Sequence, residues 1–538
     1  MTPNLTLDEF PPVSTEQWNE VVRADMKGTA PKVKLFYRAE DLPKVAYLDS
    51  PPGTFPYTRG TRGSNDWHIR QTVGSIAEAQ AALDAGADEI GFVMGDQDAS
   101  KLLDALPACI IHFQAGDRAA EVLEALAGRG VRGSIDYEPL ADFNRAGNLI
   151  RAALSPEFKP ITIRADRFSE AGATPVAELA FALAEGIEML DRIPDSAPAI
   201  AFSFAIGPNY FQEIARLRAA RTLWSRIVES FGLGVESAKM SIYAHTAHWT
   251  ESVYDAHVNL LRSTTQAMAA AIGGADSIEV EPFDDTYRAA DETSRRLARN
   301  AQLVLKREAL LDRSVDPAGG AYYLESLTDS LAREAWALLQ HIESAGGFLK
   351  YSASGALDQA IAKSRADRDS SVSTRRTTIV GTNQYPNPAE HMASRIERPD
   401  PAPRPARIFE EIRLRSERAG APRLLLLEAG DRKMRKARSG FIANFFGCGG
   451  FGVKISDSLT GDFDAVVLCS SDPEYAALAP RVIQELRAAG KNTPVLVAGN
   501  PTDSIEQLKR AGVADFIHIR TNAAEALRVW QERLGVRN

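Results

Sequence analysis

Hydrophobic and polar positions follow a regular rhythm from residue 67 onward, in which each short apolar or alternating run is followed by a stretch of helical period. Runs typical of β-strands lie at 68–73, 88–93, 108–113, 131–136, 161–164, 198–204, 239–244 and 276–281. Helical patterns separate them at 75–85, 98–105, 118–127, 145–154, 174–190, 209–231 and 254–272. Eight strands that alternate with helices predict a (β/α)8 (TIM) barrel. A doubly wound open sheet is the structural alternative, which the count of eight disfavours.

A second α/β pattern follows further along the chain. Its apolar runs lie at 423–428, 451–456, 464–469, 494–498 and 515–519. Its helical segments lie at 435–447, 473–489, 503–511 and 522–534. Five strands with crossover helices predict a flavodoxin-like, Rossmann-type domain, whose ligands bind at the carboxyl ends of the strands. The expected fold class is therefore α/β, a TIM barrel followed by a flavodoxin-like domain.

These patterns divide the chain into four parts. Residues 1–50 form an arm outside the repeat, in which Ser14 and Gln17 make a capping-box pattern. Residues 51–375 form the barrel and residues 408–538 the second domain. Residues 376–407 are rich in proline, which predicts a semi-rigid spacer rather than a core element.

Composition narrows the class of protein. The net charge of −9 argues against a nucleic-acid-binding protein. The three cysteines, Cys109, Cys448 and Cys469, have no close pair, so we expect a reducing cytoplasmic compartment and no Cys-rich metal site. No apolar run is long enough to cross a membrane, and the first residues do not have the pattern of a signal peptide.

The stretch Ile161 to Ala173, ITIRADRFSEAGA, marks the expected mouth of the barrel. Residues just past the carboxyl end of a barrel strand face the active-site side. Asp166 and Arg167 stand at this position, directly after the strand at 161–164.

Several motifs resemble those of the adenosylcobalamin-dependent acyl-CoA mutases, above all the methylmalonyl-CoA mutase family. They are PGTFPYTRG (52–60), WHIRQ (67–71), EAGATPVAELAFALAEGIE (170–188), QEIARLRAARTLW (212–224) and VDPAGGAYYLESLT (315–328). The resemblance covers nearly the whole chain. It implies a catalytic barrel followed by a cobalamin-binding domain.

The chain departs from that family where catalytic members carry their reacting groups. Catalytic chains have a tyrosine-rich insertion after the TRG motif, whereas residues 61–66 lead directly to Trp67 here. Asp166 and Arg167 replace a Tyr-His pair whose His contacts the thioester oxygen. The segment 137–149 does not match the family's carboxylate-binding stretch, and the run 243–246 has no glutamine. This version resembles the family's small, non-catalytic subunit, so no catalytic residue is expected in this chain.

The second domain departs in the same way. Cobalamin-binding relatives carry Asp-x-His-x-x-Gly after the first strand, and the His ligates cobalt. No histidine lies between His391 and His518, and the expected position falls at Asp431, Arg432 and Lys433. We therefore expect no cofactor-binding residue here, and adenosylcobalamin in a homologous large (α) subunit that forms a heterodimer with this chain. The basic segment Arg432 to Arg438 is either a contact for an acidic partner surface or a phosphate, or a solvated loop.

The resemblance thus implies a subunit that stabilises the catalytic chain of a methylmalonyl-CoA mutase, with the arm 1–50 contacting the partner. Neither nucleic acid nor membrane is an expected partner. Two alternatives remain open: an acyl-CoA mutase of altered specificity that uses a separate cobalamin protein, and a stand-alone acyl-CoA-binding protein.

Other candidate residues have simpler interpretations. Cys448 and Cys469 are expected to be small buried hydrophobes rather than reactive thiols. His245 and His248 are expected to pack as polar groups rather than bind a metal, since no carboxylate partner is evident. Gly319-Gly320 is expected to be a tight turn that opens a helix rather than a phosphate cradle.

Three further features concern the barrel wall. Arg216, Arg218 and Arg221 are expected on an exposed helix face with ion pairs. Glu279 and Glu281 form either an acid–base pair or a solvated pair at the barrel rim. Along 201–205 either the Ala/Ser set or the Phe pair faces the bore, and alternation alone does not decide which.

Overall fold

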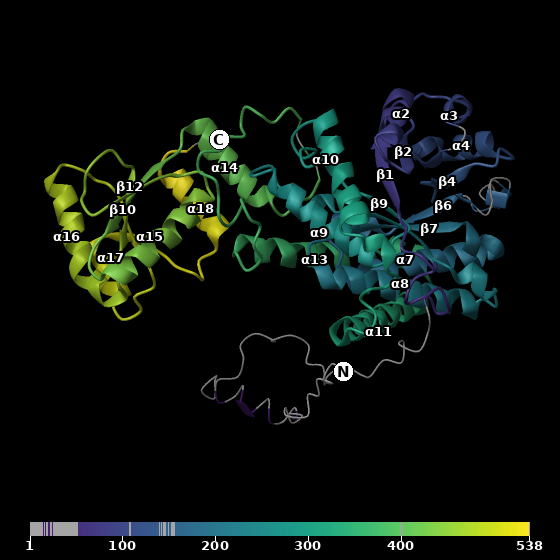
Figure 1. Cartoon of the computed structure of the whole chain (residues 1–538). Helices are drawn as coiled ribbons and strands as arrows, with labels where there is room; N and C mark the ends of the chain where they lie inside the picture. The colour runs from purple at the N-terminus through teal and green to yellow at the C-terminus, as the bar shows by residue number, and fades with distance from the viewer. Residues whose placement is uncertain are drawn as a thin grey trace, which may run out of the picture.

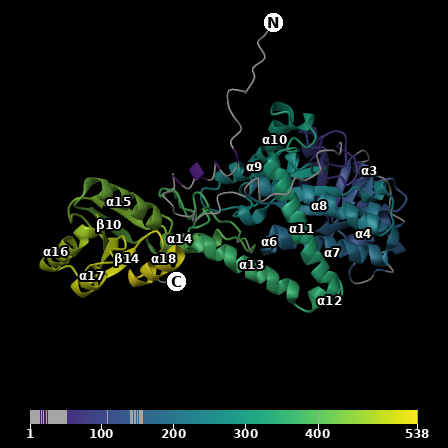
Figure 2. The ribbon, with the colours of Figure 1, turned by 90° about the horizontal axis from the view of Figure 1, so that it is seen from below.

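A computed structural model of the chain describes residues 52–106, 109–138, 157–398 and 402–536, together with Asp400 and scattered positions before residue 25 and between 140 and 151. Two α/β units are joined by a segment that includes helices α13 (Ala356–Ser373) and α14 (Arg407–Ala419), which lie between the units in both views (Figure 1; Figure 2).

The first unit is a parallel barrel. Its strands are β1 (His68–Val73), β2 (Glu89–Val93), β3 (Ile110–Gln114), β4 (Arg132–Ile135), β5 (Phe158–Lys159), β6 (Ile161–Arg164), β7 (Ile200–Ile206), β8 (Ser241–Thr246) and β9 (Ser277–Glu279). Their order is β5-β4-β3-β2-β1-β9-β8-β7-β6. The short strand β5 pairs with β4, and β6 pairs with β7, so residues 158–164 join the two edges of the sheet. Pro160 separates β5 from β6, because it has no N–H to donate to the ladder. The barrel prediction is confirmed over the open sheet.

Helices surround this barrel. They are α2 (Ile76–Asp84), α3 (Ala99–Ala105), α4 (Ala119–Leu126), α6 (Asp166–Ala171), α7 (Pro175–Arg192), α8 (Tyr210–Ser230), α9 (Val258–Ile272), α10 (Glu292–Leu303), α11 (Tyr322–Ser344) and α12 (Phe348–Ala353). Helix α9 starts later than predicted because residues 254–257 form a turn. The helix predicted at 145–154 falls largely outside the described residues.

The EAGA motif is the junction between two helices. Gly172 ends α6 in the left-handed conformation with φ of 118°, a conformation that glycine adopts without a steric penalty. The Thr174 side chain then caps α7 by accepting a hydrogen bond from the N–H of Ala177, and Pro175 occupies the first turn. This tight junction fixes where α6, and with it Asp166, lies at the barrel mouth.

Strand β7 settles which side chains face the bore. Phe202 packs against Trp224 of α8, with ring centroids 4.9 Å apart, and Phe204 lies beneath the guanidinium of Arg216 on the same helix. The Phe pair therefore points outward. Ala201, by contrast, lines a cavity inside the barrel, so the Ala/Ser set faces the bore.

The second unit confirms the flavodoxin-like prediction. Strands β10 (Arg423–Glu428), β11 (Gly452–Ser456), β12 (Ala465–Cys469), β13 (Val495–Ala498) and β14 (Val513–Ile517) form a parallel sheet of order β11-β10-β12-β13-β14. Helices α15 (Arg432–Gly447), α16 (Tyr475–Ala488), α17 (Ile505–Ala511) and α18 (Ala523–Arg533) connect its strands and follow the last one.

The proline-rich segment is packed more tightly than a spacer. Asn383, Met392 and Arg404 are 0%, 1% and 4% exposed. Met392 joins an apolar cluster with Val253 and Tyr254 of the barrel. The expectation of a spacer outside any core is therefore wrong for these positions, because apolar and charged side chains within it pair with the barrel.

The arm 1–50 lies outside the described residues except for a few positions. Among those, Ser14 and Gln17 exchange the two hydrogen bonds of the predicted capping box, at 2.8 and 3.3 Å. Of the helices in the described ranges, none combines the length and apolar character needed to span a membrane.

Candidate functional site

Asp166 lies at the barrel mouth, as predicted, but its charge is neutralised within the chain. Arg164 donates to both carboxylate oxygens, with Nε–Oδ1 at 2.9 Å and Nη2–Oδ2 at 2.6 Å. His245 Nε2 lies 3.3 Å from Oδ2. Burial alone would raise the pKa of Asp166, yet Arg164 and His245 hold it well below its ordinary value. Burial likewise disfavours the charged form of His245, but Asp166 outweighs burial and raises the pKa of His245 to about 9.

Arg167 points to the barrel wall. Its Nη2 donates to Glu185 of α7 at 2.7 Å, and its Nη1 pairs with Glu138. Its guanidinium also lies 4.8 Å from the centre of the Phe168 ring. Burial, with Glu138 adding to it, raises the pKa of Glu185, and Arg167 offsets part of this effect. Both Nη groups of Arg167 are thus engaged by carboxylates of its own chain.

A polar network continues from the mouth down the bore. His112 Nε2 lies 3.0 Å from Asp136, and Nδ1 lies 2.7 Å from Ser134. Asp136 in turn accepts from Nη1 of Arg164 at 3.2 Å. The ring of His112 packs against Tyr243 with centroids 5.6 Å apart. These contacts connect β3, β4, β6 and β8 across the inside of the barrel.

Arg70 and Tyr243 fill the middle of the bore. The Arg70 guanidinium lies 3.5 Å from the centre of the Tyr243 ring and pairs with Glu89. The Tyr243 hydroxyl donates to Glu279 at 2.7 Å, and Glu279 also accepts from the backbone N–H of Thr72. Arg70 is 3% exposed. Charged and aromatic side chains therefore occupy the axis of the barrel.

Two separate cavities lie on either side of Arg70 and Tyr243. A cavity of about 260 Å³ at the amino ends of the strands is lined by His68, Arg70 and Ser241. Another of about 320 Å³ at the carboxyl ends of β1 and β9 is lined by Arg70, Glu279 and Glu281. Because Arg70 lines both, its side chain lies between them.

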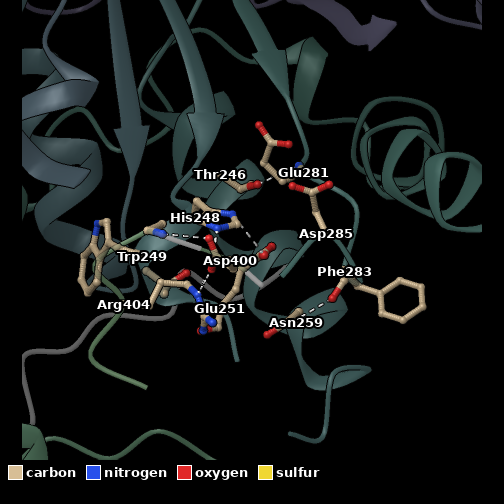
Figure 3. A network of polar contacts seen from close by, with 12 residues as sticks. Thr246, His248, Trp249, Glu251, Asn259, Glu281, Phe283, Asp285, Asp400 and Arg404 are labelled. Atoms are coloured by element: carbon tan, nitrogen blue, oxygen red, sulfur yellow. Dashed lines mark hydrogen bonds and ion pairs between the residues drawn. The ribbon is translucent and has the colours of Figure 1, made fainter. Parts of the chain in front are cut away.

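His248 takes part in a second cluster at the mouth (Figure 3). Its Nε2 lies 3.1 Å from Asp400 of the proline-rich segment, and its Nδ1 lies 3.6 Å from Glu251. Both histidines are thus bound to carboxylates. Among the described residues, no group of three or more His, Cys, Asp or Glu side chains is arranged to hold a metal ion.

The carboxyl end of the second sheet is tied together by a carboxylate of the chain itself. The Glu474 side chain accepts hydrogen bonds from the N–H groups of Asp431 and Ser471 and from the hydroxyls of Ser470 and Ser471. These bonds, above all the one from Ser471, lower the pKa of Glu474 to about 2. Gly430 lies against this carboxylate in the left-handed conformation, where an added Cβ would be 2.4 Å from Glu474 Oε2.

This end of the sheet does not fit a histidine-ligated cobalamin. Helix α15 begins at Arg432, and Asp431 caps it by accepting from the N–H of Met434 at 2.8 Å. Lys433 is exposed in the first helical turn. His518 follows β14, which is separated from β10 by β12 and β13. Within the described ranges no imidazole faces the loop after β10.

The basic segment Arg432 to Arg438 lies in the first two turns of α15. Arg438 pairs with Asp472 at 3.0 Å, and Arg435 lies 3.9 Å from Glu428. Arg432, Lys433 and Lys436 are exposed. Part of the segment therefore serves internal ion pairs, and three cations face solvent.

The three arginines of α8 are buried, so their prediction as an exposed face is wrong. Arg216, Arg218 and Arg221 are 1%, 0% and 2% exposed. Arg216 pairs with Glu178 and Glu213, and Arg218 pairs with Asp316 and Glu325. Arg221 donates to backbone carbonyls, including that of Gly273 at 2.7 Å. The helix lies between the barrel wall and α11, which leaves it no wide solvent face.

Other predictions have mixed outcomes. Glu279 is 5% exposed, so a solvated rim position is wrong for it. Cys448 and Cys469 are buried, which confirms their interpretation as small buried side chains, and burial raises the pKa of both thiols to about 12, which disfavours the thiolate. Gly320 lies in the turn before α11 and donates to Glu325, which confirms the turn that opens a helix.

Sequence reasoning missed the residues that fill the bore. Arg70, Glu89 and Arg164 were not singled out, although alternation along their strands carries a signal. In His68–Val73 and Ser241–Thr246 every second residue is polar, and these polar residues line the bore, while the apolar ones pack against helices. Asp400 had no such signal, because it lies in a segment without periodicity.

Comparison with known proteins adds an independent result. The sequence profile of methylmalonyl-CoA mutase matches residues 131–435. The methylmalonyl-CoA mutase small subunit of Porphyromonas gingivalis is 37% identical and covers 98% of this chain and 98% of its own length. The small subunit from Streptomyces virginiae is 30% identical over 97% of this chain and 98% of its own length. The large subunit from Porphyromonas gingivalis is 29% identical over 72% of this chain and 64% of its own length.

Proposed function

Because the chain belongs to the methylmalonyl-CoA mutase family, we propose that it is the small, non-catalytic subunit of a heterodimeric adenosylcobalamin-dependent methylmalonyl-CoA mutase. In this proposal the homologous large subunit binds the cofactor and interconverts methylmalonyl-CoA and succinyl-CoA. The present chain stabilises that subunit through an extensive interface, to which the arm 1–50 contributes. Obligate interfaces of this kind commonly bury about 2,000–5,000 Å².

The main support for the proposal is that side chains of this chain fill the barrel bore. Arg70 lies over the Tyr243 ring in the bore. Arg164 and His245 occupy the carboxylate oxygens of Asp166. A catalytic barrel of this family needs an open path for the CoA ester and free donors for its thioester oxygen. Positioned donors or acids contribute roughly 10²–10⁴ in rate, and here the candidate donors are bound to carboxylates of the chain itself.

The second domain supports the same assignment. When bound, adenosylcobalamin supplies radical chemistry through its carbon–cobalt bond. The loop after β10 offers no imidazole to cobalt among the described residues, and its polar groups are bonded to Glu474. In this proposal the partner subunit binds the cofactor, and the present chain contributes no ligand to cobalt.

Adding adenosylcobalamin to the isolated chain tests the proposal. The visible spectrum of the cofactor should not change with added chain, and the mutase rate should stay at background. Mixing the chain with its large subunit should then give a stable complex with mutase activity.

Two results would contradict the proposal. Tight cobalamin binding or turnover by the isolated chain would make it a mutase in its own right. A stable monomer that does not associate with the large subunit would favour a stand-alone acyl-CoA-binding protein, and a direct titration with an acyl-CoA distinguishes that case.

A further inference from the structure

Arg404 is a buried arginine that joins the proline-rich segment to both neighbouring parts of the chain. It is 4% exposed, and its Nη1 donates to the backbone carbonyl of Glu251 at 2.8 Å. Its two Nη atoms bind the Glu410 carboxylate of α14 at 2.9 and 3.0 Å, and its Nε pairs with Asp400. One guanidinium thus contacts the barrel, the linker and the first turn of α14.

The barrel loop after β8 completes this contact from its own side. Figure 3 shows the side chains of His248 and Asp400 facing each other, and His248 Nε2 lies 3.1 Å from Asp400 Oδ2. The N–H of Val253 donates to Glu410 at 2.8 Å. Two acidic side chains, Asp400 and Glu410, are therefore shared between Arg404 and the barrel loop. The linker and the barrel loop are thus joined through these two carboxylates.

We propose that loop 248–253 and the residues Asp400, Arg404 and Glu410 form a clamp that holds the second domain in a fixed orientation beside the barrel mouth, and that the clamp opens when His248 loses its positive charge. Opening separates Asp400 and Glu410 from the barrel loop and lets α14 and the second domain move together. The clamp is a property of this chain alone and does not depend on the proposed function.

The surroundings explain why the charge of His248 matters. Carboxylates face His248 from several elements: Glu251 on its own loop, Glu170 of α6, Glu281 after β9 and Asp400 of the linker. Arg404 is a cation on the linker side, and Asp285, which lies beside Glu251, pairs with Arg398 of the linker. His245 faces Glu170 and Glu281 from β8. Neutral His248 would leave Asp400 and Glu251 with less compensating charge, which weakens the contact.

The direction of the pH effect follows from two groups. Burial opposes the charged form of His248, but Asp400 and Glu251 outweigh it and raise its pKa to about 9. Burial, together with Glu281, raises the pKa of Glu251 to about 8. For both groups the folded-state pKa lies above the unfolded one. The contact therefore loses stability between about pH 4.5 and 8 through Glu251, and between about pH 6.5 and 9 through His248. The clamp should therefore be closed near pH 6.5 and open near pH 9.5.

Small-angle X-ray scattering on the full chain tests the clamp without any mutation. The radius of gyration should increase between pH 6.5 and 9.5, while far-UV circular dichroism stays constant. Hydrogen–deuterium exchange at pH 7.0 then examines the role of His248. In H248A, peptides from 247–255 and 402–415 should exchange at least tenfold faster than in the wild type.

Two matched variants control the exchange experiment. H341A removes an exposed histidine on α11 and should leave both peptides unchanged. H248Q keeps a neutral hydrogen-bond donor, and should give the open scattering profile already at pH 6.5. A scattering profile that is constant from pH 6.5 to 9.5, or an H248Q profile that matches the wild type at pH 6.5, would overturn the clamp and leave a static packing contact.

Discussion

At the scale of single residues, ion pairs within the chain organise the barrel mouth: Asp166 pairs with Arg164 and His245, and Arg167 pairs with Glu185. The position of Asp166 and Arg167 after β6 followed from counting strands, and the structure confirms it. Their partners did not follow, because Arg164, His245 and Glu185 come from separate elements whose approach depends on barrel closure. The Asp166 carboxylate, which faces the barrel mouth, is half of an internal ion pair with Arg164.

The Asp166–His245 pair should contribute a pH-dependent stability. The pKa of His245 is raised to about 9 from an ordinary value near 6.5, so the contribution is complete below about pH 6.5 and is lost as pH rises through 9. At about 1.4 kcal/mol per pKa unit, the shift from 6.5 to about 9 corresponds to roughly 3–4 kcal/mol, so replacing His245 by Ala should cost about that much more at pH 6 than at pH 10. Urea unfolding of both proteins at the two pH values measures this; an equal cost at both would refute it.

Arg216 should be among the most sensitive positions on α8. It is 1% exposed between Glu178 and Glu213, and burial raises the pKa of Glu178 to about 7 even with Arg216 present. Replacing Arg216 by Met leaves two buried acids without a cation and should destabilise the fold by about 3–5 kcal/mol. The matched change at Arg226, which pairs with Glu229 on the exposed side of the same helix, should cost less than about 0.5 kcal/mol. Similar costs at both positions would contradict this account.

At the scale of elements, hydrophobic periodicity was a good guide wherever burial is one-sided. Strands and helices of both units lie within a few residues of their predicted positions because alternation and helical period report which face is covered. The sequence-based prediction was wrong where tertiary contacts decide which face of an element is buried. Helix α8 is polar on a face that turns out to be buried, because ion pairs replace apolar packing there. The interruption of the strand at Pro160 is explained only by the structure, in which this residue lies where the two edges of the sheet meet.

Two helical glycines should respond oppositely to alanine. A Cβ at Gly186 of α7 would lie 2.6 Å from the Trp224 ring, whereas one at Gly440 of α15 would meet no atom within 4 Å. Alanine is favoured over glycine in a helix by about 0.8–1 kcal/mol, so G440A should stabilise by up to that amount. G186A should instead destabilise by about 1–3 kcal/mol through overpacking. The unfolding temperatures of the two variants provide the comparison. If both temperatures shift in the same direction, the contact with Trp224 does not determine the effect of G186A.

At the scale of the whole molecule, two units are joined by a linker (Figure 1). Each unit has its own core, and the linker is itself partly buried. Composition alone predicted a spacer, since proline clusters carry no information about which neighbour they contact. The side chains that anchor it, such as Arg404 and Met392, are visible in the sequence, but their barrel partners are not. The architecture and family could be predicted from sequence, whereas the contacts that set domain orientation could not.

The proposed role assigns the arm 1–50 to the interface with the large subunit. Deleting residues 1–50 should leave the unfolding midpoint of the isolated chain within a few degrees of the full-length value, because the barrel begins after the arm. Affinity for the large subunit should fall at least tenfold, measured by surface binding at equal protein concentrations. Unchanged affinity would remove the arm from the interface.

Counting cobalamin in the purified complex of this chain with its large subunit tests the central claim most directly. The carboxyl end of the second sheet is held by Glu474, and the barrel bore is filled by Arg70 and Tyr243. The proposal therefore predicts one adenosylcobalamin per pair of chains, measured by absorbance against protein concentration, with all mutase activity in that form. Two cobalamins per pair would contradict it and would place a second working site in this chain.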